Sequence, residues 1–139
     1  MARRVLTCRI GRRRCALPIE AVIETMRPLP LEPIADGHET VLGVAVIRSK
    51  PTVVVDLGRL LGGESMPPAR FVTIRTGPRT VALAVEEVLG VETLAEGALH
   101  ALPPLLATSS SAVVSLGNVD RDLLVVLEAS RLAPEEDVA

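Results

Sequence analysis

The sequence predicts an all-β protein made of two similar small barrels that pack on each other. Its apolar residues fall in short runs typical of β-strands, its 139 residues repeat one pattern twice, and each repeat holds about five such runs. Five short strands form too little sheet to bury both faces while the sheet is open, so each repeat is expected to curl into a barrel. Short helical turns are the only other elements expected.

The first repeat begins with an alternating run and a returning strand that form a hairpin. Leu6, Cys8 and Ile10 share one face of the first run, and Gly11 opens the turn that follows it. Pro18 fits the first position of a short helical stretch, because the N–H that proline lacks has no partner there. The elements expected in this repeat are strands at 5–10, 15–17, 44–47 and 52–55, helical stretches at 19–24 and 57–61, and a connector at 28–40.

The second repeat has the same order of elements. A Gly77-Pro78 turn separates two strand-like runs, and the small residues of 101–111 indicate a loop. A last hairpin around residues 118–122 ends the repeat. The strands expected in this half are 71–76, 81–85, 112–116 and 123–127.

The repeat itself is the most informative feature of the chain. A shift of 66 residues lays residues 4–24 over residues 70–90, and nine of the 21 positions are then identical. The identical pairs are Arg4/Arg70, Thr7/Thr73, Arg9/Arg75, Gly11/Gly77, Arg13/Arg79, Ala16/Ala82, Leu17/Leu83, Glu20/Glu86 and Val22/Val88. Chance is a poor explanation for agreement over this length without a gap.

The ends of the two repeats match as well. Residues 53–56 lie over residues 125–128 at a shift of 72, because the second repeat carries the longer loop. We therefore expect one domain over residues 1–139, with halves at about 4–66 and 67–133 intertwined around one core. The last strands of the repeats lack polar alternation, as expected if the two units also pack on each other.

Composition excludes several classes of function. The 15 basic and 17 acidic residues give a net charge of −2, and Phe71 is the only aromatic residue, so a nucleic-acid partner is not expected. The apolar runs are far shorter than the roughly 20 residues of a membrane helix, and the N-terminus lacks the features of a secretion signal. We expect a soluble cytoplasmic domain in which Cys8 and Cys15 are buried free thiols.

The chemistry of an enzyme is also missing. His38 and His100 fall in loop-like stretches, and neither a zinc-binding cysteine pattern nor a phosphate-binding glycine loop occurs. Glu86 and Glu87 could resemble an acid–base pair, but neighbouring residues on a strand point to opposite faces. We predict no catalytic residues, no cofactor and no metal. An interaction module is the expected class.

Several segments, in this order, resemble the CheW family of chemotaxis coupling proteins. The resemblance covers about residues 4 to 133, and the segments that carry it are 15–24, 43–48, 53–57, 81–91 and 123–132. It implies two five-stranded SH3-like barrels around a shared hydrophobic core. It also implies a non-catalytic adaptor of two-component signalling that joins a chemoreceptor cytoplasmic tip to the regulatory domain of a CheA-type histidine kinase. Such an adaptor would be recruited to receptor arrays at the membrane without inserting into it.

The resemblance places a receptor-binding groove between the barrels. By this resemblance the groove residues are Val22, Glu24, Gly43, Val44 and Arg48, with Glu24 and Arg48 as the acidic and basic partners. The residues that would bind the kinase are not assigned, beyond the family's use of the outer barrel ends.

The chain departs from the family pattern close to this groove. The family segment "NLRG" reads Val46-Ile47-Arg48-Ser49 here, the proline before the "VDL" strand is replaced by Val53, and the aspartate of the second half is Glu86. Two alternatives therefore stay open. One is a divergent accessory CheW-like protein that serves a pathway other than chemotaxis and has lost one partner. The other is a small SH3-like-barrel module for another ligand.

Overall fold

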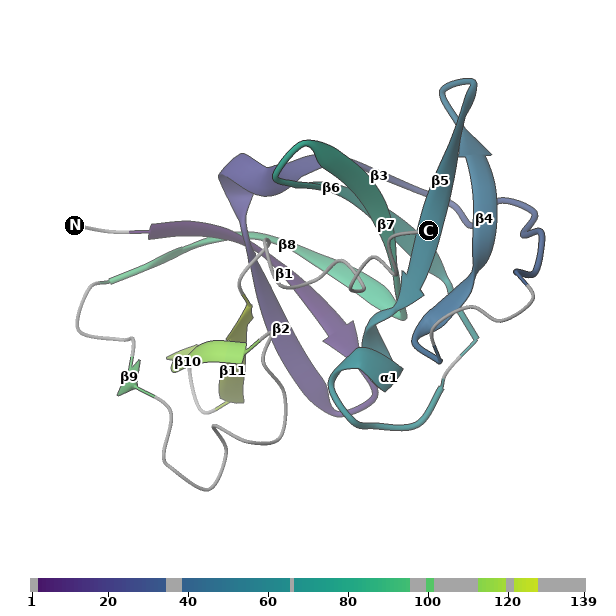
Figure 1. Cartoon of the computed structure of the whole chain (residues 1–139). Coiled ribbons are helices and arrows are strands. Elements are labelled where there is room, and N and C mark those ends of the chain that lie inside the picture. Colours follow the sequence, from purple (N-terminus) through teal and green to yellow (C-terminus); the bar gives the residue numbers. More distant parts are fainter. Residues whose placement is uncertain are drawn as a thin grey trace.

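The computed structural model describes residues 3–34, 39–65, 67–95, 100–101, 113–119 and 122–127, and nearly all of its regular structure is β-strand (Figure 1). The strands are β1 (Arg3–Ile10), β2 (Arg13–Pro18), β3 (Val22–Met26), β4 (Val41–Ile47), β5 (Lys50–Asp56), β6 (Arg70–Thr76), β7 (Arg79–Val85), β8 (Glu87–Leu94), β9 (His100–Ala101), β10 (Val113–Val119) and β11 (Asp122–Leu127). The all-β prediction is confirmed. Most of the predicted loop at 101–111 lies outside the described residues.

Two short helical elements interrupt the strands. The helical stretch predicted at 19–24 is wrong beyond its first turn: a 3-10 turn, η1 (Ile19–Ala21), leads directly into β3. The β-branched Val22 and Ile23 favour the extended conformation there. The second element, α1 (Leu57–Leu60), is confirmed, and the Asp56 side chain caps it by accepting a hydrogen bond from the Arg59 N–H at 3.3 Å.

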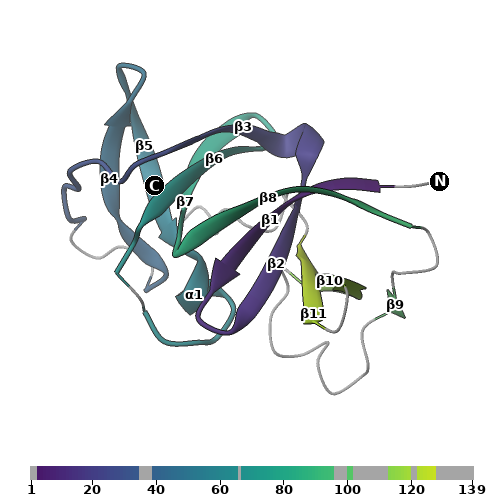
Figure 2. The ribbon, with the colours of Figure 1, turned by 180° about the vertical axis from the view of Figure 1, so that it is seen from behind.

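The strands form two sheets that both draw on the two halves of the chain. One sheet has the order β8-β1-β2-β11-β10-β9, and the other has the order β3-β6-β7-β5-β4. Each sheet therefore combines the first hairpin of one half with later strands of the other half (Figures 1 and 2). The expectation that each repeat curls into a barrel of its own is wrong, because each sheet takes strands from both repeats.

The two sheets also remain open. In the five-stranded sheet, β3 and β4 are the two outer strands, and the described residues form no backbone ladder between them. The outer edge of β4 pairs instead with the connector after β3, where Glu32 forms a bridge with Val44. The all-β fold of two similar sheets thus holds, while barrel closure does not.

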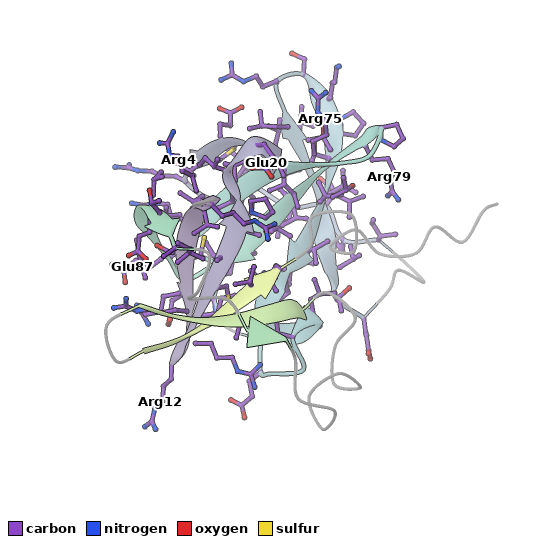
Figure 3. All side chains as sticks on the ribbon, turned by 90° about the vertical axis from the view of Figure 1, so that its left-hand side faces the viewer. Arg4, Arg12, Glu20, Arg75, Arg79 and Glu87 are labelled. Atoms are coloured by element: carbon purple, nitrogen blue, oxygen red, sulfur yellow. The ribbon has the colours of Figure 1, made fainter. Side chains whose placement is uncertain are left out.

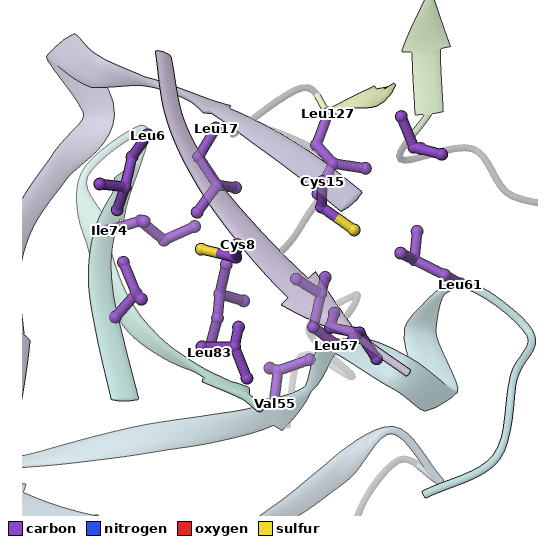
Figure 4. Packing of buried hydrophobic residues seen from close by; sticks show 14 of the residues in the cluster. Leu6, Cys8, Cys15, Leu17, Val55, Leu57, Leu61, Ile74, Leu83 and Leu127 are labelled. Carbon is purple, nitrogen blue, oxygen red and sulfur yellow. The ribbon is translucent and has the colours of Figure 1, made fainter. Parts of the chain in front are cut away.

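Both faces of each sheet carry buried side chains, which explains the unbroken apolar runs of the sequence. The largest cluster takes side chains from both sheets, among them Leu6, Cys8 and Leu17 of one and Ile74 and Leu83 of the other (Figure 4). This cluster is the predicted shared core.

The opposite faces of the two sheets bury a smaller cluster each, at matching positions of the repeat. Phe71, Ala82 and Val54 belong to the cluster of the five-stranded sheet. The equivalent residues Val5, Ala16 and Val126 form the cluster of the other sheet, together with Leu94. Phe71 is completely buried.

Candidate functional site

The structure brings together two of the five predicted groove residues, Glu24 and Arg48. Glu24 lies on β3 and Arg48 lies in the turn between β4 and β5, so the pair spans the two outer strands of the five-stranded sheet. Arg48 donates from Nε to Glu24 Oε2 and from Nη2 to Glu24 Oε1, both at 2.8 Å. This two-bond geometry fixes the orientation of both groups, which a lysine could not do.

The turn that presents Arg48 has an unusual backbone. Arg48 and Ser49 form a two-residue connection between β4 and β5, with φ angles of 51° and 65°. Two-residue hairpin turns with both φ values positive are usually made by Asn-Gly or Asp-Gly, because a Cβ atom disfavours this conformation. The serine that stands in place of the family's glycine therefore leaves the hairpin intact but strains it.

The ion pair shifts the pKa of both partners while leaving the arginine open to contact. The hydrogen bond from Arg48 lowers the pKa of Glu24, and the hydrogen bond to Glu24 raises the pKa of Arg48. The Arg48 side chain is 77% exposed and that of Glu24 is 27% exposed. Because the folded pKa of Glu24 is lowered, the pair is complete above the ordinary carboxyl pKa and is lost as the pH falls through the lowered value.

Gly43 and Val44 have a structural role on β4. Val44 exchanges two backbone hydrogen bonds with Glu32, each of 2.8 Å. Gly43 has a φ of 154°, and a Cβ atom built on it would lie 2.5 Å from the Glu32 carbonyl oxygen. Glycine at this position is what allows the connector after β3 to cross β4 so closely.

Val22, the fifth predicted groove residue, is half-buried on β3 and packs against the shared core. Two exposed apolar residues lie close to the pair in the sequence: Ile23, next to Glu24, is 46% exposed, and Val46, two residues before Arg48, is 68% exposed. Neither residue could be singled out from the sequence, because both stand in apolar runs without polar alternation.

A second group of charges joins the halves of the chain near the first hairpin. Arg9 on β1 contacts Glu86 Oε2 at 2.6 Å and Glu87 Oε1 at 3.0 Å, and Glu86 also accepts the Gly11 N–H at 3.0 Å. The expectation that the two glutamates diverge is wrong, because Glu86 occupies a bend between β7 and β8 and not a strand. Both carboxylates are held by one arginine, an arrangement that serves structure.

The repeat does not preserve this group. Arg75 and Glu20 are the equivalents of Arg9 and Glu86, and no ion pair joins them in the described structure (Figure 3). Ala21 stands where the other half has Glu87. Arg75 is exposed.

Other candidate chemistry is limited. The described residues contain no group of three or more His, Cys, Asp or Glu side chains placed to hold a metal ion. None of their helices is long and apolar enough to cross a membrane. His38 and the side chain of His100 lie outside the described residues.

Comparisons with known proteins agree with the fold. The family description "CheW-like domain" matches residues 4–137. Among solved structures, the scaffolding protein TtCheW from Thermoanaerobacter tengcongensis superimposes with a TM-score of 0.82 at 20% sequence identity, over 92% of this chain and 90% of that chain. A search of curated proteins found no match.

Proposed function

The chain belongs to the family of CheW-like domains, and we propose that it acts as an adaptor that couples a chemoreceptor to a CheA-type histidine kinase. It would do so by binding both proteins and without catalysing a reaction. The proposal includes a cytoplasmic location at membrane receptor arrays, and no nucleic-acid partner. The observation that supports it most directly is the exposed, two-bond Glu24–Arg48 pair on the predicted receptor-facing surface.

We propose the two outer strands around this pair as the receptor contact. Arg48 is oriented by Glu24 but remains mostly exposed, and Ile23 and Val46, close to the pair in the sequence, are exposed apolar residues. Exposed apolar residues together with an oriented charge suit an amphipathic helix as the partner.

The other three predicted groove residues have different places in this contact. Val44 lies on β4, the strand that leads to Arg48, and would stand beside the contact. Val22 and Gly43 would support the surface from within, Val22 through the shared core and Gly43 through the close approach of the connector.

The test is the substitution Arg48→Ala, titrated with a receptor cytoplasmic tip by calorimetry. Loss of an oriented charge at a binding surface should weaken receptor binding about tenfold. The melting temperature should stay nearly unchanged, because exposed ion pairs contribute little to folding. Arg75→Ala is the matched control, since Arg75 is exposed and forms no ion pair within the described part of the chain, and it should bind the receptor like wild type.

Reversal of both charges provides a second check. The double variant Glu24→Arg with Arg48→Glu restores the pair in the opposite sense and should recover part of the loss. Receptor binding of Arg48→Ala at the wild-type level would show that the contact lies elsewhere. Unfolding of Arg48→Ala would instead assign Arg48 a structural role.

The changed turn sequence favours a second candidate, an accessory adaptor that has lost one of the two partners. Val46-Ile47-Arg48-Ser49 stands at the tip of the proposed receptor contact. Separate titrations with the receptor tip and with the kinase regulatory domain distinguish the candidates. The coupling adaptor binds both proteins, and the accessory form binds one.

A further inference from the structure

Four of the nine ladders that assemble the two sheets in the described residues run between the halves of the chain. Among the described residues, the first half pairs only β1 with β2 and β4 with β5 internally, and the second half pairs β6 with β7 and β10 with β9 and β11. The remaining ladders, β1–β8, β2–β11, β3–β6 and β5–β7, all join one half to the other. Each half is thus completed by the other.

We propose that two copies of this chain exchange halves and form a dimer in which each half is completed by the partner copy. The partner is a second copy of this chain, because the surfaces that would pair in the dimer are those that already join the two halves within one chain. An exchanged dimer reproduces the four ladders and the shared core without any new contact. Such exchange is a low-cost route to dimers when a connecting segment can open.

The connecting segment is the stretch between Leu60, where α1 ends, and Arg70, where β6 begins. This places the hinge at the predicted boundary of the halves near residues 66 and 67. The roughly nine residues of the stretch, fully extended, reach about 30 Å. The stretch includes Gly62, which has a φ of 82°, followed by Gly63, and later two consecutive prolines.

At the start of this segment Leu61 is buried in the shared core, and its carbonyl accepts a hydrogen bond from Arg13 Nη1 at 3.0 Å, so Leu61 would stay in place while the rest of the segment opens. The fixed contacts of the segment include the Ser65 Oγ–Asp56 Oδ2 hydrogen bond of 2.5 Å and the Gly63 N–H bond to the Gly58 carbonyl at 2.9 Å. Ala69 also donates its N–H to the Val85 carbonyl at 3.0 Å. The balance between monomer and dimer is then set by concentration and by the length of the segment, because the interface itself is the same in both forms.

The exchange leaves the proposed receptor contact intact. Glu24 and Arg48 both belong to the first half, so their pair does not depend on which copy supplies the second half. An exchanged dimer would present two such contacts on one particle. Two linked contacts bind a receptor cluster with higher avidity than one. This consequence depends on the proposed function, whereas the exchange itself does not.

The ion pairs of Arg9 with Glu86 and Glu87 allow a direct test, because they join the two halves. One full-length variant carries Arg9→Glu, and a second carries Glu86→Arg and Glu87→Arg. Alone, each variant places like charges together between its own halves. A mixed exchanged dimer has two interfaces between halves. One brings Glu at position 9 of the first variant against Arg at positions 86 and 87 of the second, and the other brings the native Arg9 against the native Glu86 and Glu87. Both interfaces then have opposite charges.

The variants are unfolded in denaturant, mixed and refolded, and their mass is measured by light scattering after size exclusion. We expect a mixed dimer of twice the 14.7 kDa monomer mass as the main species. Refolding each variant separately is the first control and should give much less dimer. The second control is a single chain with all three substitutions, which restores opposite charges within one chain and should refold as a monomer.

A mixed dimer supports the exchange. If the triple variant folds and the mixture still gives only monomers, the proposal is overturned. If the triple variant does not fold, the deciding protein is the otherwise wild-type chain lacking Glu64 and Ser65. Shortening the connecting segment should then raise its dimer fraction severalfold over wild type, and an unchanged monomer would overturn the proposal.

Discussion

At the scale of single residues, the strained turn at Arg48 and Ser49 gives a prediction for stability. Ser49 has a φ of 65°, a conformation that glycine adopts without the steric cost of a Cβ atom. The substitution Ser49→Gly should therefore raise the free energy of unfolding by about 1 kcal/mol, measured by urea denaturation. The reciprocal control is Gly77→Ser, because Gly77 has a φ of 66° in the turn between β6 and β7, and it should lose a similar amount. A loss of stability in Ser49→Gly would contradict this account.

The two cysteines predict how stability changes in alkali. Burial raises the pKa of the Cys8 and Cys15 thiols to about 12, and both are free. Above a pH of about 9 the unfolded chain loses thiol protons that the folded chain keeps, so stability falls by up to about 1.4 kcal/mol per pH unit for each thiol. The chain has no tyrosine and a single lysine, Lys50, which leaves the thiols as the main groups in this range.

Thiol labelling checks the same prediction. At a pH of about 8 the native protein should react slowly with a thiol reagent, because the reactive thiolate is scarce and buried. Both thiols of each chain should react as soon as the protein is unfolded without reductant. A stoichiometric disulfide in the purified protein would contradict the prediction, as would a stability that stays flat as the pH rises from about 9 to about 11.

At the scale of elements, Phe71 on β6 is predicted to hold the small core of the five-stranded sheet. It is completely buried with Val54 and Ala82, and three of the five other buried residues of its cluster are alanines. Phe71→Ala should cost about 3–5 kcal/mol of unfolding free energy, as for other buried phenylalanines. The surface control is Val91→Ala on β8, which should change stability by less than about 0.5 kcal/mol, because Val91 is 49% exposed. A cost below about 1 kcal/mol for Phe71→Ala would contradict its place in the core.

The strands and turns could be predicted from the sequence, whereas part of the site could not. Alternation and turn residues mark where strands lie, so the runs at 71–76 and 81–85 correspond closely to β6 and β7. Alternation reports the face of a side chain, but it does not report how far a strand edge is covered. The partial burial of Val22 and the exposure of Val46 depend on that cover, so alternation alone does not predict them.

At the scale of the whole molecule, the repeat predicts two similar sheets but not which strands they contain. A strand of one half can pair with its own half or with the equivalent place in the other half, and both choices bury the same faces. The pattern of Leu17 and Leu83, identical in the two repeats, is compatible with either arrangement. Only the ladders of the structure, β1 with β8 and β3 with β6, distinguish them.

The ladders between the two halves of one chain lead to a last prediction, on fragments of the chain. Fragments 1–66 and 67–139 should each fail to fold alone. The described part of the first half would keep only the isolated hairpins β1–β2 and β4–β5, and isolated two-stranded hairpins are marginal in water. When mixed, the fragments should assemble, because all ladders between the halves can then form.

Circular dichroism and size exclusion measure this outcome. The mixture should regain the β-sheet spectrum, a cooperative thermal transition and the mass of the intact chain, while neither fragment alone should show a transition. The Arg9→Glu substitution in the first fragment should weaken the assembly, and Glu86→Arg with Glu87→Arg in the second fragment should restore it, since these residues join the two halves. A cooperative transition in fragment 1–66 alone would show that the half is a self-sufficient unit, and the ladders between the halves would then not be what holds the molecule together.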